Sequence, residues 1–341
     1  MGSAVRLLLT AVALAGLLVV ATGCGKTTVV REPAIQVKAA SAPAPGGSAR
    51  ANAVTIAVVT HGQASSPFWA IVRNGVEAAA RQMDVLVSYR APDVYSLARM
   101  KTMIDQAVAR HPDGLVVSIP EPGLAPAIRR ATAAGIPVVS INSGGEVFRR
   151  LGVLAHVGQP EGRSGRAAGE RLARAGVRRA LCVNQQVGNQ GLDARCAGLD
   201  RAMRRAGGTS RVLGVDDQSA ATPGRIAAAI RAGRIDGVLT TNATTALEAM
   251  QAVRRLGRVN SVKIGTFDLG PDVLNAVKTG RLLFAVDQQA YLQGYLPVVM
   301  LTERARYGLF PADGDVSATG PHFVTKADAA KAIELSKRSI R

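Results

Sequence analysis

Residues 54–60, with the sequence VTIAVVT, decide the fold that this chain predicts. The stretch is short, continuous and rich in β-branched residues, which is typical of a parallel strand buried on both faces. A polar loop follows at 61–67, and residues 68–77 then carry apolar side chains at intervals of three and four, which predicts an amphipathic helix. Phe68 and Trp69, the only tryptophan of the chain, stand just past the strand. Open α/β sheets bind ligands at this end of their strands.

The alternation of strand and helix patterns continues along the chain. Further strands are predicted at 84–89, 113–120, 136–142, 154–158, 180–184, 211–215, 236–242 and 262–268. Helices are predicted between them at 94–110, 124–134, 162–175, 192–207 and 226–232. The Asp-Gly that opens the strand at 113 recurs at 236, so the second half resembles a copy of the first. This order predicts an α/β fold of two similar doubly wound lobes.

Polar residues end several of these strands. Asn142 does so in the first half, and Asn184, Asn242 and Asp268 do so in the second. Any one of them is equally typical of a turn residue that ends a strand. Four together favour a site, provided that the carboxyl ends of both sheets face one cleft.

The two aromatic residues suggest what such a cleft would bind. Phe68 and Trp69 opposite amide and carboxylate groups suit a ligand with apolar faces and a hydroxyl rim, such as a sugar or a cyclitol. The alternative is that both aromatic residues belong to the hydrophobic core on the helix face.

The first residues carry an export pattern. Arg6 precedes an apolar run at 7–20 and the segment Ala21-Thr22-Gly23-Cys24, which predicts a secretory signal over residues 1–24. The segment resembles a bacterial lipoprotein box, in which the cysteine is lipidated. A single-pass anchor is the alternative, but the run is shorter than the ~20 residues that a spanning helix needs. Residues 25–52 are rich in Ala, Pro, Ser and Gly and predict a flexible tether.

Two further cysteines remain. Cys182 lies in a predicted strand and Cys196 in a predicted helix, and outside the cytoplasm such a pair is expected to form a disulfide. The bridge would stabilise the fold by roughly 3 kcal/mol. Two free buried thiols are the alternative. A metal site is not expected, because no histidine stands near either cysteine at ligand spacing.

Composition excludes two other classes. The formal net charge of +18 comes largely from arginines scattered singly or in pairs over predicted helices, which indicates solvated faces and not a nucleic-acid site. Weak attraction to anionic lipid would be a simpler consequence. None of the four histidines stands in a nucleophile or zinc motif, and the glycine-rich segment 158–165 lacks the dinucleotide and P-loop spacings. We therefore expect no catalysis, no cofactor and no metal, and we assign 158–165 to a connection between lobes.

Residues 54–326 resemble the sugar-binding, type I family of periplasmic substrate-binding proteins that serve ABC importers, and most of all its ribose-type branch. Any one of the shared segments is common, but their order is specific. The segments are SSPFW at 65–69, DGLVVS at 113–118, AGIPVVSIN at 134–142, VGQ at 157–159, RCAGL at 195–199, DGVLTTN at 236–242, FD at 267–268 and DQQ at 287–289.

The resemblance implies a set of ligand-binding residues. Phe68 and Trp69 would sandwich a sugar ring, and Arg195 would hold ring or anomeric oxygens through its planar fork of donors, so that Arg195→Ala would abolish binding and leave the fold intact. The family's other polar ligands fall on Asn242, Asp268 and Gln288.

Departures from the family pattern affect the first lobe. Ser66 replaces a usual asparagine, and Asn142-Ser143 stand where the ribose-type branch carries Asp-Arg. The strong bidentate hydrogen bonding of the Asp-Arg pair is therefore lost in the first lobe, which puts ribose itself in doubt as the ligand. The resemblance implies that Ser66, Asn142 and Ser143 bind the ligand from these positions. Residues 216–217, where the family has an aromatic residue, are both aspartate.

The resemblance also implies a division of the chain. One lobe would comprise 53–157 and 289–320, and the other 158–288 and 321–341, with crossings near Gly158, Asp287 and Val324. Ligand binding would close this hinge, and a membrane permease would recognise the closed form. We expect a monomer in the periplasm or on the outer face of the cytoplasmic membrane, held by a lipid anchor.

Three rival functions use the same core fold. A sensor or chemoreceptor-type protein would bind a furanosyl signal or another small polar molecule in the same cleft. A regulator of the lactose-repressor type would need an N-terminal DNA-binding headpiece, and a signal and tether occupy that place here. An enzyme of doubly wound fold would turn over the bound sugar.

Overall fold

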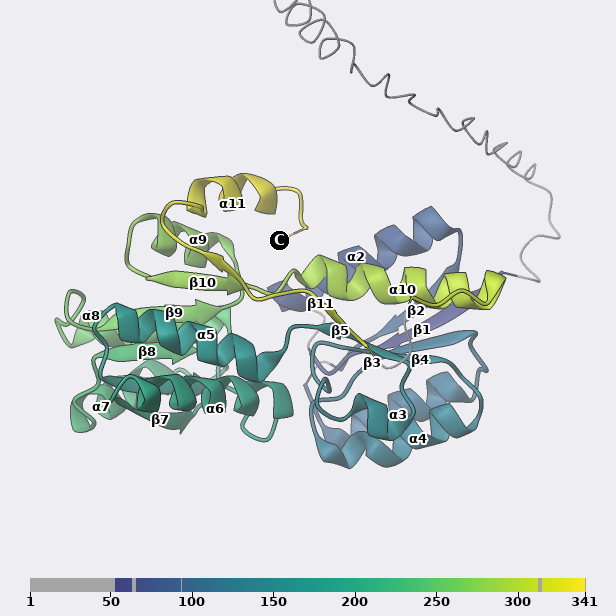
Figure 1. Ribbon diagram of the computed structural model, residues 1–341, viewed down its shortest axis with the longest axis horizontal. Helices are drawn as coiled ribbons and strands as arrows, with labels where there is room; N and C mark the ends of the chain where they lie inside the picture. Colours follow the sequence, from purple (N-terminus) through teal and green to yellow (C-terminus); the bar gives the residue numbers. More distant parts are fainter. Residues whose placement is uncertain (1–52, 63–65, 93, 312–314, 341) are drawn as a thin grey trace, which may run out of the picture. The chain divides into compact units, whose positions relative to one another are not determined.

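The computed structural model describes residues 53–62, 66–92, 94–311 and 315–340 (Figure 1). The predicted signal, the tether and Cys24 lie outside the described residues. Within those that are described, no helix combines the length and the apolar character that crossing a membrane requires.

The first sheet, sheet A, is parallel throughout, in the order β11-β5-β4-β3-β1-β2. Its strands are β1 Thr55–Val59, β2 Leu86–Arg90, β3 Gly114–Ser118, β4 Val138–Ile141, β5 Ala155–Gly158 and β11 Val316–Ala318. The central strand β3 is buried along its whole length, which explains its continuous apolar sequence.

Helices cover both faces of sheet A (Figure 1). Helices α2 and α10 pack together on one face, and α3 and α4 lie on the other. The elements are α2 Pro67–Met83, α3 Leu97–Val108, η1 Pro122–Leu124, α4 Ala125–Ala133, η2 Phe148–Leu151 and α10 Ala290–Tyr307.

The second sheet, sheet B, has the order β12-β10-β9-β8-β6-β7, with β12 alone antiparallel to its neighbour. Its strands are β6 Arg179–Asn184, β7 Thr209–Gly214, β8 Gly237–Thr240, β9 Lys263–Phe267, β10 Phe284–Asp287 and β12 His322–Val324. Helices α5 and α6 cover one face, and α7, α8, α9 and α11 the other. Their bounds are α5 Glu161–Arg174, α6 Gln190–Arg205, α7 Thr222–Ala232, α8 Ala243–Arg255, α9 Pro271–Lys278 and α11 Ala329–Ser336.

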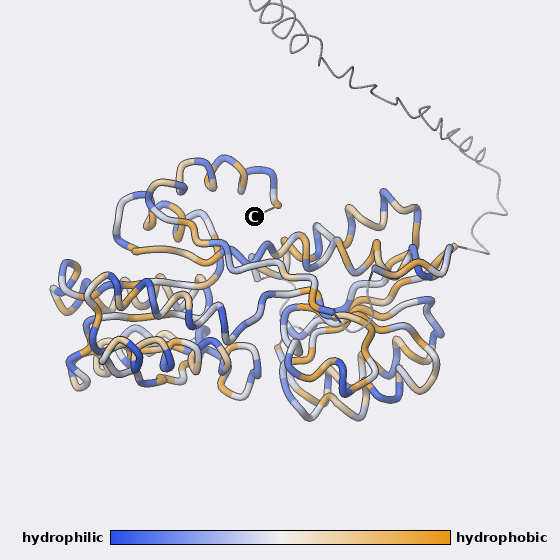
Figure 2. Tube along the Cα trace, viewed as in Figure 1, coloured by the Kyte–Doolittle hydropathy of each residue, from blue (hydrophilic) through white to orange (hydrophobic). Residues whose placement is uncertain are grey.

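The two sheets repeat one layout. The order β5-β4-β3-β1-β2 in sheet A matches β10-β9-β8-β6-β7 in sheet B, so the predicted fold class of two similar doubly wound lobes is confirmed. Within the described residues, the chain passes between the sheets three times, between β5 and α5, between β10 and α10, and between β11 and β12. Hydrophobic residues gather along the strands of both sheets (Figure 2).

A close contact between two helices of the second lobe positions part of the candidate functional site. Helices α5 and α6 pack against each other at Gly165 and Gly198. A Cβ at Gly165 would overlap the carbonyl oxygen of Arg195, and a Cβ at Gly198 would overlap that of Gly162. The two glycines therefore let the backbones approach, and this brings α6 against the first turn of α5. Helices α2 and α10 make the same kind of contact at Gly75 and Gly294.

A disulfide joins Cys182 on β6 to Cys196 on α6, with Cα atoms 5.7 Å apart. Both residues are buried in the cluster that lies between sheet B and helices α5 and α6. The bridge ties α6 to the sheet one residue after Arg195.

Candidate functional site

A cavity of about 520 Å³ lies where the carboxyl ends of strands from both sheets meet. This volume is ordinary for a small-molecule site. Its lining comes from both lobes and comprises His61, Gly62, Ser66, Pro67, Phe68, Trp69, Val94, Tyr95, Asn142, Gln185, Gln186, Asn189, Leu192, Arg195, Asp216, Asp217, Gln218, Thr241, Asn242, Thr244, Asp268 and Gln288.

The aromatic residues at the start of α2 form a corner of this cavity. Trp69 is 7% exposed and packs partly on the core of sheet A, while Phe68 is half-buried. Their ring centroids lie 5.2 Å apart with the planes at 87°. This differs from the sandwich that the resemblance implies, because two perpendicular rings cannot cover both faces of one sugar. Ser66, just before the helix, also lines the cavity.

His61 is a lining residue that the sequence did not single out. Its ring stands edge-on to Trp69 at 5.0 Å, and its Nδ1 lies 2.8 Å from the Ser118 hydroxyl. The amide Nδ2 of Asn189 lies 3.4 Å from Nε2 and can donate only to an unprotonated nitrogen, which places the ring proton on Nδ1. Burial lowers the pKa of His61 to about 3, so the ring is neutral and fixed.

Arg195 lies on α6 at the floor of the cavity and is 2% exposed. Its Nε and Nη2 donate to the two oxygens of Glu161 at 2.6 and 2.9 Å, and Nη2 also donates to Gln288 Oε1 at 3.0 Å. Nη1 donates to the Thr241 carbonyl at 2.9 Å. The guanidinium carbon lies 4.3 Å from the centroid of the Phe267 ring. Most of the N–H donors of this guanidinium, which was predicted to hold a ligand, therefore bond to other groups of the protein.

Glu161, the first residue of α5, is the partner that the sequence did not reveal. It is 7% exposed, and its Oε2 also accepts from the Gln159 amide at 2.9 Å. Burial raises the pKa of this carboxyl, and the donors of Arg195 and Gln159 oppose the rise. Both oxygens accept hydrogen bonds, which is the pattern of an ionised carboxylate. Charge attraction from Glu161 and Asp268 raises the pKa of Arg195 despite its burial, so the pair is a buried salt bridge.

Asp268 and Gln288 lie side by side at the ends of β9 and β10. The Gln288 amide donates to Asp268 Oδ1, and Asp268 takes a left-handed φ of 68° that turns it away from the strand. Burial raises the pKa of Asp268 to about 6, with Glu161 and Asp287 adding to the rise and Arg195 and Gln288 opposing it. Its carboxylate can accept ligand hydroxyls and titrates close to neutral pH.

Asn142 and Ser143 end β4 in the first lobe. Asn142 lines the cavity and lies within hydrogen-bond distance of Gln293 Oε1 at 3.2 Å and Gln288 Oε1 at 3.5 Å. Ser143 does not line the cavity, because its hydroxyl lies 3.1 Å from Asn189 Oδ1 of the second lobe. The position of Ser143 therefore does not support the prediction that it contacts the ligand. Its hydroxyl instead makes a hydrogen bond between the two lobes.

Asn242 serves both of the roles that the sequence left open. It caps α8, because its Oδ1 accepts from the backbone N of Thr245 at 2.9 Å, and it also lines the cavity. Its amide donates to Asp217 Oδ2 at 2.8 Å. Asn184, in contrast, is a turn residue, since its side chain bonds Asp193 and the backbone N of Gln186.

Carboxylates are frequent on the second-lobe side. Asp216 and Asp217 line the cavity after β7, and their charges act on Glu248, which does not line it. Burial, Asp217 and Asp216 raise the pKa of Glu248 to about 7. Within the part of the chain that the structure describes, no three His, Cys, Asp or Glu side chains form a group suited to a metal ion.

Several lining residues escaped the sequence analysis although one signal points to them. Tyr95, Gln185 and Thr241 follow β2, β6 and β8, so each stands past the carboxyl end of a strand. Applied to every strand, the rule that ligands bind at these ends would have found them.

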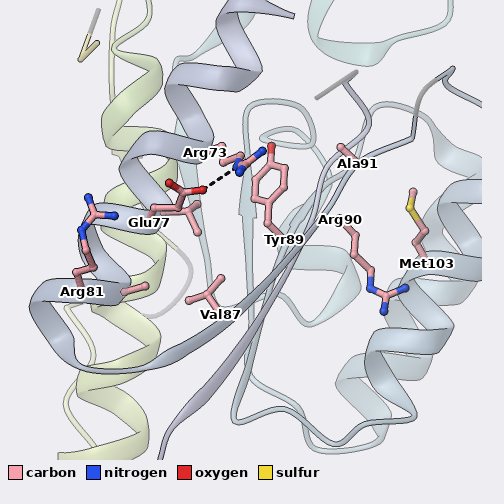
Figure 3. Close-up of a pocket in the computed structure, with 10 residues that line it drawn as sticks. Arg73, Glu77, Arg81, Val87, Tyr89, Arg90, Ala91 and Met103 are labelled. Atoms are coloured by element: carbon pink, nitrogen blue, oxygen red, sulfur yellow. Dashed lines mark hydrogen bonds and ion pairs between the residues drawn. The ribbon is translucent and has the colours of Figure 1, made fainter. Parts of the chain in front are cut away.

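A second hollow, of about 720 Å³, lies at the open edge of sheet A between α2, β2 and α3 (Figure 3). Its polar side chains include the ion pair of Arg73 and Glu77, at 2.7 Å and half exposed. The lining of this hollow comes from one lobe alone, and we do not assign the site to it.

The fold and the first cavity define a two-lobed ligand-binding protein. Residues 56–308 match the periplasmic binding protein domain, which is most of the chain. The protein therefore belongs to the periplasmic binding protein family. Like its relatives, it is a substrate-binding protein and not an enzyme.

Three relatives illustrate the family. A carbohydrate transporter from Acidothermus cellulolyticus 11B, solved in complex with myo-inositol, is 36% identical with a TM-score of 0.79, and the match covers 85% of this chain and 100% of that one. The D-ribose/D-allose-binding protein of Pseudomonas aeruginosa is 28% identical over 222 residues, 61% of this chain and 68% of the relative. The xylose/arabinose-binding protein of Sulfolobus acidocaldarius is 23% identical over 261 residues, 70% of this chain and 63% of the relative.

Proposed function

We propose that this protein is the extracytoplasmic substrate-binding component of an ABC importer and that it binds an uncharged cyclitol or monosaccharide in the cavity between its lobes. The observation that carries the proposal is the lining of that cavity, in which an aromatic corner faces amide, guanidinium and carboxylate groups. Such a lining matches a ring with apolar faces and a rim of hydroxyls. The myo-inositol bound by the relative of 36% identity makes a cyclitol the first candidate.

Hinge closure is the proposed mechanism. The ligand would contact both lobes, and those contacts would stabilise the closed arrangement relative to the open one. The three crossings near residues 158–161, 287–290 and 318–322 would absorb the change in backbone angles. A permease would recognise the closed form, and a lipid on Cys24 would hold the protein at the membrane.

The fluorescence of Trp69 provides the test. Trp69 is the only indole of the chain and it lines the cavity, so a ligand there changes its surroundings directly. We expect titration with myo-inositol, ribose, xylose, glucose and galactose to change the emission with at least one of them, in a saturable way. The same ligand should raise the melting temperature. A panel without any response would contradict the proposed function.

Binding of the neutral ligand is expected to weaken as the pH falls through about 6. Asp268 has a pKa near 6 in the empty cavity, and its ionised form accepts ligand hydroxyls. The ionised fraction falls about tenfold between pH 7 and pH 5, so the dissociation constant should rise about tenfold. His61 does not contribute, because its pKa is about 3. Calorimetric titration at a series of pH values measures the change.

Two variants identify the titrating group that causes this pH dependence. Asp268→Asn should bind more weakly and lose the step near pH 6. Glu248→Gln should keep it, because Glu248, with a pKa of about 7, stands outside the cavity lining. A step that persists in Asp268→Asn would show that another group is responsible.

A further inference from the structure

The donors of Arg195 are almost fully used within the protein. A guanidinium has five N–H donors. Nε and one hydrogen of Nη2 go to Glu161, the other Nη2 hydrogen goes to Gln288, and one Nη1 hydrogen goes to the Thr241 carbonyl. One Nη1 hydrogen remains for a ligand. Arg195 can therefore offer a single hydrogen bond, while the edge that would grip an anion with two parallel bonds is occupied.

The charge of Arg195 is also cancelled. Glu161 contacts it at 2.6 Å in a site where both side chains are nearly inaccessible to water. Among the described residues that line the cavity, Arg195 is the one cationic side chain, whereas Asp216, Asp217 and Asp268 supply carboxylates. Although the whole chain has a net charge of +18, its cavity presents negative groups to a ligand.

We propose that Glu161 is a specificity-determining residue, which occupies Arg195 and thereby restricts the cavity to uncharged polyols, excluding sugar acids and sugar phosphates. This rests on the proposed function. Glu161 does not touch the ligand itself but acts through the guanidinium that it holds.

The physical reason is the free-energy penalty that an anionic ligand would incur by replacing Glu161 as the partner of Arg195. An anionic ligand could reach the Nε and Nη2 edge only by displacing Glu161, which would leave that carboxylate buried without its counter-charge. The negative charge of the ligand would also approach the Asp268 carboxylate at the cavity wall. A neutral polyol incurs neither penalty, because a single Nη1 donor and the carboxylates suffice for its hydroxyls.

The test compares neutral ligands with their acidic counterparts. The probes are myo-inositol with myo-inositol 1-phosphate, glucose with glucuronate, and galactose with galacturonate, titrated by calorimetry at pH 7.5. The variants are Glu161→Gln and, as a matched control on the same helix, Glu170→Gln, whose carboxylate is exposed beside Arg166. Both variants remove one negative charge, but only Glu161→Gln changes the environment of Arg195.

We expect the wild type to bind the neutral member of its preferred pair at least about 100-fold more tightly than the acid. Glu161→Gln should narrow that ratio at least about tenfold by gaining affinity for the acid, and Glu170→Gln should leave it unchanged. Wild-type binding of the acid within tenfold of the neutral ligand would overturn the inference whatever the variant does, as would an unchanged ratio in a folded Glu161→Gln. Failure of the wild type to bind any neutral probe would instead overturn the proposed function, and the inference with it.

Discussion

Arg195→Ala is expected to abolish polyol binding and to lower the free energy of unfolding by about 3–5 kcal/mol. The substitution removes the last free Nη1 donor from the cavity, and it also leaves Glu161 as a buried carboxylate without its partner. Breaking one side of a buried pair costs more than the pair contributes, because the remaining charge keeps its desolvation penalty. Chemical denaturation measures the stability, and calorimetric titration measures the binding.

The control for this prediction lies on the same helix. Arg204 pairs with Asp200 at 2.6 Å, but its side chain is 75% exposed, so Arg204→Ala should leave stability and binding unchanged. The double variant Arg195→Met, Glu161→Met should recover at least half of the lost stability without recovering binding, because no buried charge remains. If Arg195→Ala were as stable as Arg204→Ala, the buried salt bridge would not exist in solution.

Gly165→Ala is expected to lower the free energy of unfolding by about 3 kcal/mol and to weaken polyol binding at least about tenfold. The added methyl group would overlap the backbone carbonyl of Arg195, which cannot move aside as a flexible side chain could. Helices α5 and α6 would have to separate, and that separation would pull Arg195 from Glu161. Thermal or chemical unfolding, together with titration of the neutral ligand, measures both effects.

Gly162→Ala is the matched control on α5. A Cβ at Gly162 lies near only the end of the Arg201 side chain and the carbonyl of Ala194, 3.1 and 3.9 Å away, so it fits after a small side-chain shift. We expect a stability within about 1 kcal/mol of the wild type. Equal stability of Gly162→Ala and Gly165→Ala would mean that the close helix contact does not set the position of Arg195.

The fold was predictable because strand patterns and helix patterns alternate along most of the chain up to residue 268, although α8 was not predicted. Beyond residue 268 no elements were predicted, although α9, β10, α10, β11, β12 and α11 follow. Helix α10 lies against sheet A and carries Pro297 and Gly294 within it, so it lacks a simple amphipathic stripe. Such a segment takes its structure from its tertiary contacts, which a local pattern does not contain.

The cavity was predictable in outline and less so in its hydrogen bonds. Phe68, Trp69 and Asp268 were found because each stands past the end of a strand, and all three line the cavity. Ser143 was predicted from the family resemblance, but its hydroxyl is directed at Asn189, a contact between lobes that no local pattern encodes.

Glu161 shows why a sequence rarely reveals how a charged residue is used. It stands in a glycine-rich connection, and its partner is 34 positions further along the chain, among many other arginines. Only the close packing of α5 on α6 selects that pair. From sequence alone, Arg195 was assigned to the ligand and its removal was expected to leave the fold intact, whereas the structure gives most of its hydrogen bonds to the protein.

A crystal structure of the protein with myo-inositol would show whether a neutral polyol binds between the lobes. We expect one ring in the cavity between the lobes, with an apolar face on Trp69 or Phe68, a hydroxyl within hydrogen-bond distance of the Asp268 carboxylate, and Arg195 still paired with Glu161. Density for the ligand outside this cavity, or a ligand that has displaced Glu161 from Arg195, would contradict it.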